Sequence, residues 1–591
     1  MSQFEGGGGW RSWSGRGFDT IPGIVRHRLL THRLAPRFVT TLFTVLRIPM
    51  RRSLTLSIAA ALLVAWAPGL VYAQASPYVP TDGPDYRDLD ALVMSGLVTE
   101  IITGQRPHSR MAFARFVWEA RGRLEASSEA RPKARFTEAL ERLERRFSAE
   151  IEGLCSPGVE ACNAPVPYAA MRQAALDVTR AGSPPRAIPT GLQEGDQIDG
   201  VINPLLQNNQ GRILADGWTA GGEGILDFAV GPRLAVQLRP RVWITEGAGG
   251  GGEPDVTLLQ GYARTTFGKM SLEVGRIQAP HGPSRGNGPV VSANARGMDM
   301  IRLTHDRPAR LPWVFRGLGP FRFTAFVADM GRDRDTPGSK LIVFEGAVRP
   351  WSNLELGGTI LNHQGGDGAP EATWRERLSD ILLLESRRFL PFSGVPPISD
   401  KALSLDARLT LPGSGVELYT EVMTTDDHNL FHSVRDGLWN NAAWIAGLGD
   451  EGRVEYWMEW GHSGVRAFTH HQFSSGLTLD GRVIGSAMGP LAARMSGGLE
   501  WTGSRSHLAL AAHWERYSGD HWINGHQAGF IRSADNPDEI RLRTTLDWTR
   551  HPDITGLRTT VRLGYEHVTR FDFTDKNRSN FMVQVRAEYL W

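Results

Sequence analysis

Tryptophan, amide and guanidinium side chains gather in three segments of this sequence. The groups are Trp374 with Arg375; Trp439, Asn440, Asn441 and Trp444; and His521, Trp522 and Asn524. Aromatic faces cover the apolar faces of sugar rings, while amides and guanidinium groups bind sugar hydroxyls and carboxylates. Each tryptophan taken singly could instead belong to an aromatic girdle at a membrane surface. Taken together, the three groups predict contact with a polysaccharide.

Motifs that would support catalysis fit the sequence poorly. The run Gly461-His462-Ser463-Gly464 lacks the spacing of a nucleophile elbow. His428 and His432 follow two aspartates, but no glutamate stands at the general-base position of a zinc protease. We therefore expect neither an enzyme nor a bound metal or cofactor.

The elements that would position these side chains are clearest at the C-terminus. Residues of opposite character alternate there: Phe581, Val583, Val585, Ala587, Tyr589 and Trp591 with Met582, Gln584, Arg586, Glu588 and Leu590. One apolar face that ends on an aromatic residue resembles the signal by which outer-membrane barrels are recognised for insertion. We therefore expect the barrel-insertion machinery as a partner, bound through the strand that ends at Trp591.

The same alternation recurs at 403–411, 453–460 and 540–548. A charged side chain that faces lipid near the bilayer midplane costs roughly 2–4 kcal/mol, so the charges in these segments must face a watery lumen. Because lipid also forbids open sheet edges, such strands must close on themselves. Counted from about residue 211, the sequence predicts an all-β transmembrane barrel of about 18 antiparallel strands, monomeric and surrounded by outer-membrane lipid.

Connections between these segments alternate in length. The short ones are 267–269, 349–352, 412–414, 449–451 and 502–506, and the long ones are 277–297, 329–340, 362–400, 424–440, 461–490, 518–539 and 569–580. Short periplasmic turns and long external loops are typical of outer-membrane barrels. Segment 307–319 departs from this rule because it is longer than the other connections on its side.

The N-terminal region predicts export. Arg51 and Arg52, the apolar run 54–67 and the small residues at 71–73 indicate a signal peptide at 50–73, which makes 1–49 a mis-annotated extension. Cys155 and Cys162 both lie in the exported part, where they could form a disulfide. The formal net charge of +2 gives no indication of a nucleic-acid partner. The mean hydropathy of −0.26 is compatible with a barrel, since only every second residue of a strand faces lipid.

Residues 74–195 predict a small periplasmic helical domain, with helices from 84 to about 180. Its clearest helix has apolar residues at a period of 3.6, namely Phe136, Leu140, Leu143, Phe147 and Ile151. Ser109 is the expected N-cap of the helix before it. The stretch from Tyr86 to Phe113 resembles an S-layer homology repeat, a module that holds cell-wall polymers. This is one imperfect copy of the repeat, so the favoured interpretation is a helical bundle that plugs or props the barrel.

Three stretches within the expected barrel, 196–591, resemble the Wzi-type capsule-assembly family. They are Leu272–Arg276 with Gly282-Pro283 and Ser292–Leu303; Val416–Glu421 with Asp426-Asp427; and Gly476–Ser486. The resemblance implies an outer-membrane lectin of about eighteen strands that retains capsular or other exported polysaccharide at the cell surface. It adds Arg285, Asn294 and Arg296 to the expected polysaccharide-binding residues.

Two other functions compete with polysaccharide binding. A porin or solute channel is favoured by the mixed charges expected in the lumen, which are Glu455, Glu459, Arg541, Arg543, Asp547, Arg586 and Glu588. An outer-membrane hydrolase would need a nucleophile beside a base, and no motif in the sequence supplies that pair. Conductance in a planar bilayer separates the channel from the binding protein.

Overall fold

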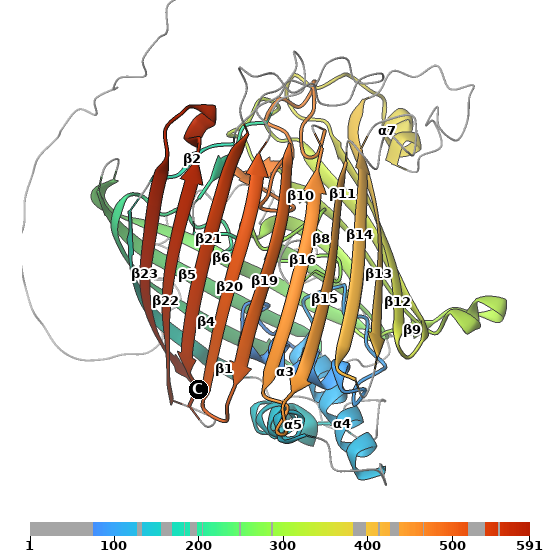
Figure 1. Cartoon of the computed structure of the whole chain (residues 1–591). Coiled ribbons are helices and arrows are strands. Elements are labelled where there is room, and N and C mark those ends of the chain that lie inside the picture. The colour runs from blue at the N-terminus through green and yellow to red at the C-terminus, as the bar shows by residue number, and fades with distance from the viewer. Residues whose placement is uncertain are drawn as a thin grey trace, which may run out of the picture. The chain divides into compact units, whose positions relative to one another are not determined.

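A closed antiparallel barrel forms most of the structure (Figure 1). The structure is a computed structural model and describes residues 75–126, 133–154, 168–182, 184–188, 198–203, 205–247, 250–284, 288–381, 398–411, 414–425, 437–464, 466–517, 538–552 and 556–591. The expected extension, the signal peptide and both cysteines lie outside these residues.

Eighteen strands make up the barrel wall in the described part of the chain. They are β1 (Tyr168–Ala181), β4 (Gly217–Val230), β5 (Leu234–Gly247), β6 (Gly250–Phe267), β7 (Met270–Ile277), β8 (Met298–His305), β10 (Pro320–Asp329), β11 (Lys340–Trp351), β12 (Leu354–Gln364), β13 (Ser399–Leu411), β14 (Val416–Thr425), β15 (Leu438–Leu448), β16 (Val454–Ser463), β19 (Ala492–Thr502), β20 (Ser506–Tyr517), β21 (Glu539–Arg550), β22 (Gly556–Thr569) and β23 (Arg578–Leu590). The two-residue strand β9 (Ala309–Arg310) continues β8 along the edge of β10. Neighbours in the chain pair antiparallel, and β1 pairs with β23 to close the barrel. The predicted fold class is confirmed.

The barrel begins earlier than the sequence analysis predicted. Helices were expected to about residue 180 and the barrel from 196, but β1 lies at Tyr168–Ala181, between β23 and β4. Leu176 and Val178 point outward and are exposed, while Asp177 and Thr179 point inward and are buried. This alternation is short, and a run of alanines precedes it, so the strand resembled the end of a helical domain. As a result, seventeen of the eighteen wall strands follow residue 211.

The outer face of the wall is apolar and ends in aromatic residues. Leucine, isoleucine and valine side chains are exposed along the middle of the strands. Exposed aromatic residues at the short-turn end are Trp351, Trp501, Trp548, Tyr589 and Trp591, and those toward the long-loop end include Trp218, Trp514 and Phe581. An apolar band between two aromatic girdles fits a bilayer. In the described part of the chain, each helix is too short or too polar to span a membrane.

Four helices form the N-terminal domain, at the short-turn end of the barrel (Figure 1). They are α3 (Pro84–Met94), α4 (Arg110–Ala126), α5 (Ala134–Arg146) and α6 (Ser148–Glu152). The expected apolar faces meet in one core that includes Leu89, Phe113, Leu140 and Phe147. Ser109 caps α4 as predicted, because its hydroxyl accepts a hydrogen bond from the backbone N–H of Ala112, 3.1 Å away.

Shorter elements complete the structure. The helix α7 (Trp374–Ile381) lies on a long loop, and the 3-10 helices η1 (Trp313–Leu318) and η2 (Phe571–Phe573) lie on connections between strands. Two pairs of two-residue strands, β2 (Arg186–Ala187) with β3 (Val201–Ile202) and β17 (Thr478–Leu479) with β18 (Arg482–Val483), join segments outside the wall. The connections alternate in length as predicted except between β5 and β6, where two residues join the strands at the long-loop end. The long-loop end is therefore the external end, and the short-turn end is periplasmic.

Candidate functional site

Two external loops fold back into the barrel and fill its external half. The described residues of these loops, 278–284 with 288–297 and 466–491, contribute apolar side chains to a core inside the wall, among them Val291, Phe468 and Ile484. These side chains pack against inward residues at the external ends of the strands, such as Met423 on β14. Inward positions at this end of the wall are therefore apolar and are covered by the protein's own loops, where the sequence predicted a watery lumen.

The residues that carried the family resemblance hold these two loops together. The backbone N–H of Ser292 donates to the carbonyl oxygen of Ile484 at 2.7 Å, and the Ser292 hydroxyl donates to Gly485. The Asn294 amide donates to the carbonyl of Val483 at 3.0 Å and accepts a bond from Arg482 at 2.7 Å. The motif segments therefore join the two external loops through hydrogen bonds, and this contact is called the loop lock below.

Asn294 and Arg296 were expected to bind polysaccharide, and the structure places both in this lock. Asn294 is 3% exposed, so its amide is fully used by the protein. Arg296 forms an ion pair with Asp480 of the other loop. The third residue of this group, Arg285, lies outside the described residues.

The external rim carries a more accessible aromatic site on α7. Trp374 is 69% exposed, and the Arg375 guanidinium lies 5.5 Å from the centre of its indole ring. A capping box begins the helix, because Thr373 N–H donates to Glu376 at 2.7 Å and Glu376 N–H donates to the Thr373 hydroxyl at 3.3 Å. The backbone and hydroxyl bonds from Thr373 lower the pKa of Glu376.

The other end of α7 is fixed to the barrel rim. Asp380 accepts hydrogen bonds from Asn362 on β12 at 2.8 Å and from Ser399 on β13 at 2.6 Å, and forms an ion pair with Lys401. The helix α7 is therefore held against the barrel rim, and it presents Trp374 and Arg375 at the external end (Figure 1).

The group at 439–444 lies on strand β15 and its members point to opposite sides. Asn440 and Trp444 point inward and are buried, while Trp439 and Asn441 lie on the outward face. Trp444 stacks on Trp457 with ring centres 5.3 Å apart. The expected loop cluster is therefore split, because side chains alternate across a strand. Trp522 and Asn524 lie outside the described residues.

The helical domain fills the periplasmic half of the lumen. Its segment 99–109 reaches the external loops, where Gly282 N–H donates to the carbonyl of Gly104 at 2.9 Å. Glu355 of β12 accepts hydrogen bonds from the backbone N–H of Thr103 at 3.0 Å and of Gly104 at 2.8 Å. Tyr78 lies inside the barrel, between the helical domain and the external loops, and contacts Glu273 of the wall.

Ion pairs fasten the same domain to the wall and turns. Asp82 binds the Arg239 guanidinium through two contacts, of 2.7 and 3.0 Å. Burial alone would raise the pKa of Asp82, but the charge and hydrogen bonds of Arg239 lower it overall. Arg453, on the turn before β16, binds Glu138 of α5 through two contacts, of 2.7 and 3.0 Å.

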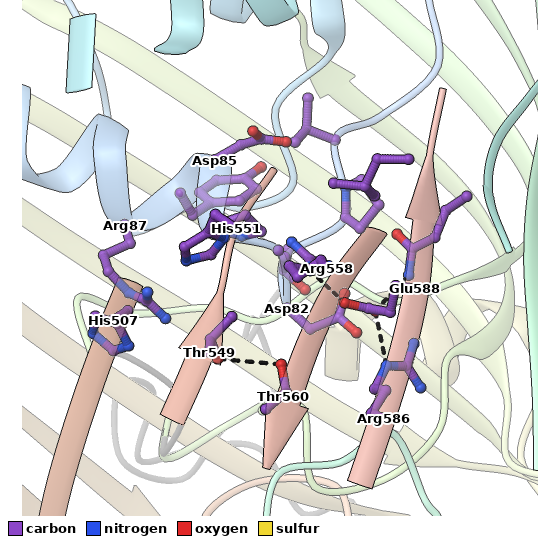
Figure 2. A pocket seen from close by; sticks show the side chains of 18 of the residues that line it. Asp82, Asp85, Arg87, His507, Thr549, His551, Arg558, Thr560, Arg586 and Glu588 are labelled. Atoms are coloured by element: carbon purple, nitrogen blue, oxygen red, sulfur yellow. Dashed lines mark hydrogen bonds and ion pairs between the residues drawn. The ribbon is translucent and has the colours of Figure 1, made fainter. Parts of the chain in front are cut away.

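A polar cavity of about 600 Å³ remains between the helical domain and the wall strands β1, β4, β5 and β19 to β23, and Figure 2 shows the part beside α3. Arg87 of α3 points from the helical domain toward His507, and Thr549, Arg558 and Thr560 line the wall. Burial, then the positive charges of Arg87 and Arg558, lower the pKa of His551 to about 3, so its ring is neutral at ordinary pH.

Sequence analysis did not single out this cavity. The signal was present in the inward positions of β20 to β22, where polar residues alternate with outward leucines and tryptophans. However, alternation shows only that a residue faces the lumen, and Arg87 belongs to a helix whose docking could not be predicted. The expected lumen charges are largely paired, for example Arg543 with Glu515 at 2.9 Å and Arg586 with Glu588 at 2.8 Å.

Comparison with known proteins gives one family and several structural neighbours. The family model described as capsule assembly protein Wzi matches residues 197–582. No curated protein matches the chain. The structure is similar to Wzi of Escherichia coli, described as an outer membrane protein involved in group 1 capsule assembly and a carbohydrate-binding β-barrel, with 16% identity and a TM-score of 0.60, covering 88% of this chain and 100% of that chain.

Weaker similarity extends to two barrels of Pseudomonas aeruginosa. OprD has 12% identity and a TM-score of 0.39, covering 71% of this chain and 94% of that one. OccD3 has 11% identity and a TM-score of 0.40, covering 72% and 92%. The barrel, its apolar band and the family match together make this chain an integral protein of the outer membrane.

Proposed function

The chain belongs to the Wzi family of capsule assembly proteins, and from this premise we propose that it binds and retains capsular or other exported polysaccharide at the cell surface. The observation that carries the proposal is the family match, which spans 197–582 and so most of the barrel. The Escherichia coli neighbour, described as a carbohydrate-binding barrel, is consistent with it.

The binding surface that we propose is the external rim around α7. Trp374 offers an exposed aromatic face to a sugar ring, and Arg375 offers hydrogen-bond donors to hydroxyls and carboxylates. The mounting of α7 on Asp380 limits the entropy lost when a glycan binds. Many weak contacts along one polymer would add through effective concentration, so each site can bind weakly.

We propose that the protein retains polysaccharide by binding alone. The protein would bind glycan reversibly, make and break no bond, and need no cofactor. Outer-membrane lipid and the barrel-insertion machinery, acting on β23 up to Trp591, are its proposed partners during assembly, and we expect a monomer. A diffusion channel is less favoured, because external loops and helical domain both enter the lumen.

The test compares polysaccharide retention in cells that make the wild-type protein, none, or single variants. Deletion should release surface polysaccharide into the medium, and Trp374→Ala should release an intermediate amount. Trp351→Ala is the matched control, since Trp351 is 64% exposed but lies at the periplasmic end. Unchanged retention in the deletion strain would refute the function. Equal loss in both tryptophan variants would refute the site on α7.

A further inference from the structure

Arg87 lines the periplasmic cavity and has no ion-pair partner in the part of the chain that the structure describes. Among the described residues, no carboxylate lies within ion-pair distance of its guanidinium, which points into the cavity (Figure 2). The two acids with the largest electrostatic effect on Arg87, Glu500 and Asp88, already have other partners. Asp88 binds Arg135 and Arg142, at 2.9 and 2.8 Å, and Glu500 lies 3.0 Å from His507. Burial lowers the pKa of Arg87, against the opposing charges of Glu500 and Asp88.

The rest of the cavity is rich in hydrogen-bond donors. Twelve arginines and nine carboxylates line it, so positive charge is in excess. Arg212 and Arg241 are buried, and among the described residues two guanidinium nitrogens of Arg212 and one of Arg241 have no hydrogen-bond partner. An unpaired buried donor costs free energy, and a ligand with oxygen acceptors would recover that cost.

Neutral polar groups stand beside these cations. The hydroxyls of Thr549 and Thr560 are 3.1 Å apart and both face the cavity (Figure 2). The neutral ring of His551 supplies one donor and one acceptor. A simple inorganic anion offers mainly acceptors, whereas a sugar acid also carries hydroxyls that donate, so it can use both the donors and the acceptors of these groups. The volume of about 600 Å³ is in the range of pockets that enclose ligands larger than a single ion.

We propose that this cavity binds an acidic sugar unit, with the ligand carboxylate on Arg87 and its hydroxyls on Thr549, Thr560 and His551. The choice of a sugar among anions rests on the function proposed above, and the inference adds both the acidic class and a second binding place. The cavity is reached from the periplasmic end, because the turns that carry Ser504 and His551 line it. A bound ligand would bridge α3 and the wall, and so hold the helical domain in place.

The experiment measures binding of a short oligouronate to the full-length protein in detergent by calorimetry and by thermal unfolding. Trigalacturonic acid is the probe, maltotriose is its neutral counterpart, and inorganic phosphate is the simple anion. We expect trigalacturonic acid alone to bind and to raise the unfolding temperature. Arg87→Gln should weaken binding roughly tenfold or more, since one charge-assisted hydrogen bond is lost.

Controls separate this result from folding and from the surface function. Arg87→Gln should fold, because Arg87 forms no ion pair, and its ligand-free unfolding temperature should match the wild type. Arg121→Gln, exposed on α4 and outside the cavity, should bind like the wild type. Equal binding of phosphate, equal binding by Arg87→Gln, or no binding of trigalacturonic acid would each overturn the proposal. Cell-surface retention, measured separately with Trp374→Ala, reports on the surface function alone.

Discussion

Gly485 lies where the two external loops meet, and its missing side chain makes their contact possible. A Cβ at this position would overlap the carbonyl oxygen of Pro289 in one loop and the ring of Phe468 in its own loop. The carbonyl of the same glycine accepts the hydroxyl of Ser292. The loop lock therefore depends on close backbone approach at one residue, which glycine permits.

Gly485→Ala should destabilise the external plug by about 1–3 kcal/mol, the usual cost of overpacking. The expected result is a lower unfolding temperature in detergent, read by heat-modifiability on gels. Gly346→Ala is the matched control, because a Cβ there would meet only the Phe321 ring, at 3.7 Å. Equal unfolding temperatures for the two variants would contradict the close contact.

His108 is a buried histidine between the helical domain and the wall. It lies beside Tyr86 of α3 and Phe116 of α4, and Arg322 of β10 approaches its Nδ1 at 2.9 Å. Burial, then the charges of Arg322 and Arg106, lower the pKa of His108 well below its usual value, against the opposing effect of Asp306. The folded protein therefore holds this ring neutral.

Acidification should weaken docking of the helical domain through His108. The unfolded histidine takes up its proton near pH ~6.5 while the folded one does not, so stability is unaffected above that pH and falls below it, by up to about 1.4 kcal/mol per pH unit for one proton. Thermal unfolding across this range should show a steeper loss for the wild type than for His108→Gln. Parallel curves for the two proteins would contradict the assignment.

The element η1 explains why the connection 307–319 is longer than its periplasmic neighbours. Trp313 and Val314 are 88% and 85% exposed, and Phe315 is exposed beside them. Pro320, which follows the helix and Gly319, begins β10 next to the end of β11 at Trp351. The helix therefore leaves the barrel at the level of the periplasmic aromatic girdle and projects outward beside β9 (Figure 1).

This continuity with the girdle predicts that η1 enters the periplasmic leaflet of the outer membrane. In proteoliposomes, Trp313→Phe should remove fluorescence that brominated phospholipids quench, because the native indole contacts acyl chains. Trp374→Phe should instead remove fluorescence that iodide in the water quenches. If iodide and not bromolipid quenched Trp313, η1 would lie in water and lipid would be the wrong partner.

Strands in which apolar and polar residues alternate over many positions could be predicted from the sequence, whereas short or irregular elements could not. The side chains of β21 and β23 alternate between lipid and lumen as predicted, since a charge on the lipid side would be costly. The strand β1 was missed because its alternation is short. The Trp439–Trp444 group was interpreted as a loop, although these residues continue the strand pattern of β15. The helix α7 was not predicted, because the residues between Trp374 and Ile381 carry no strong apolar face.

At the scale of the whole molecule, the sequence predicted a barrel with a helical bundle that plugs or props it, but not the external loops that fill the other end. Inward polar residues such as Arg541 fit a water-filled channel and a plugged barrel equally well. In the structure Arg541 is 1% exposed and pairs with Glu539 at 3.0 Å and Glu566 at 3.3 Å. Long-range packing of loops and helices decides between a water-filled channel and a plugged barrel. The local periodicity of the strands contains no information on that packing.

The external loops close one end of the lumen and the helical domain closes the other. We therefore expect the full-length protein to conduct no steady current in a planar bilayer. The external loops and the segment around Gly104 meet inside the barrel, so an ion must displace packed protein from either side. A diffusion porin in the same bilayer is the positive control, because it shows that a barrel inserts and that its current is recorded. Gly485→Ala loosens only the external plug and should give at most brief openings, since the helical domain still occupies the other half. Large, stable conductance steps from the wild type would mean that the plugs leave the lumen in the membrane. The channel would then displace surface retention as the function.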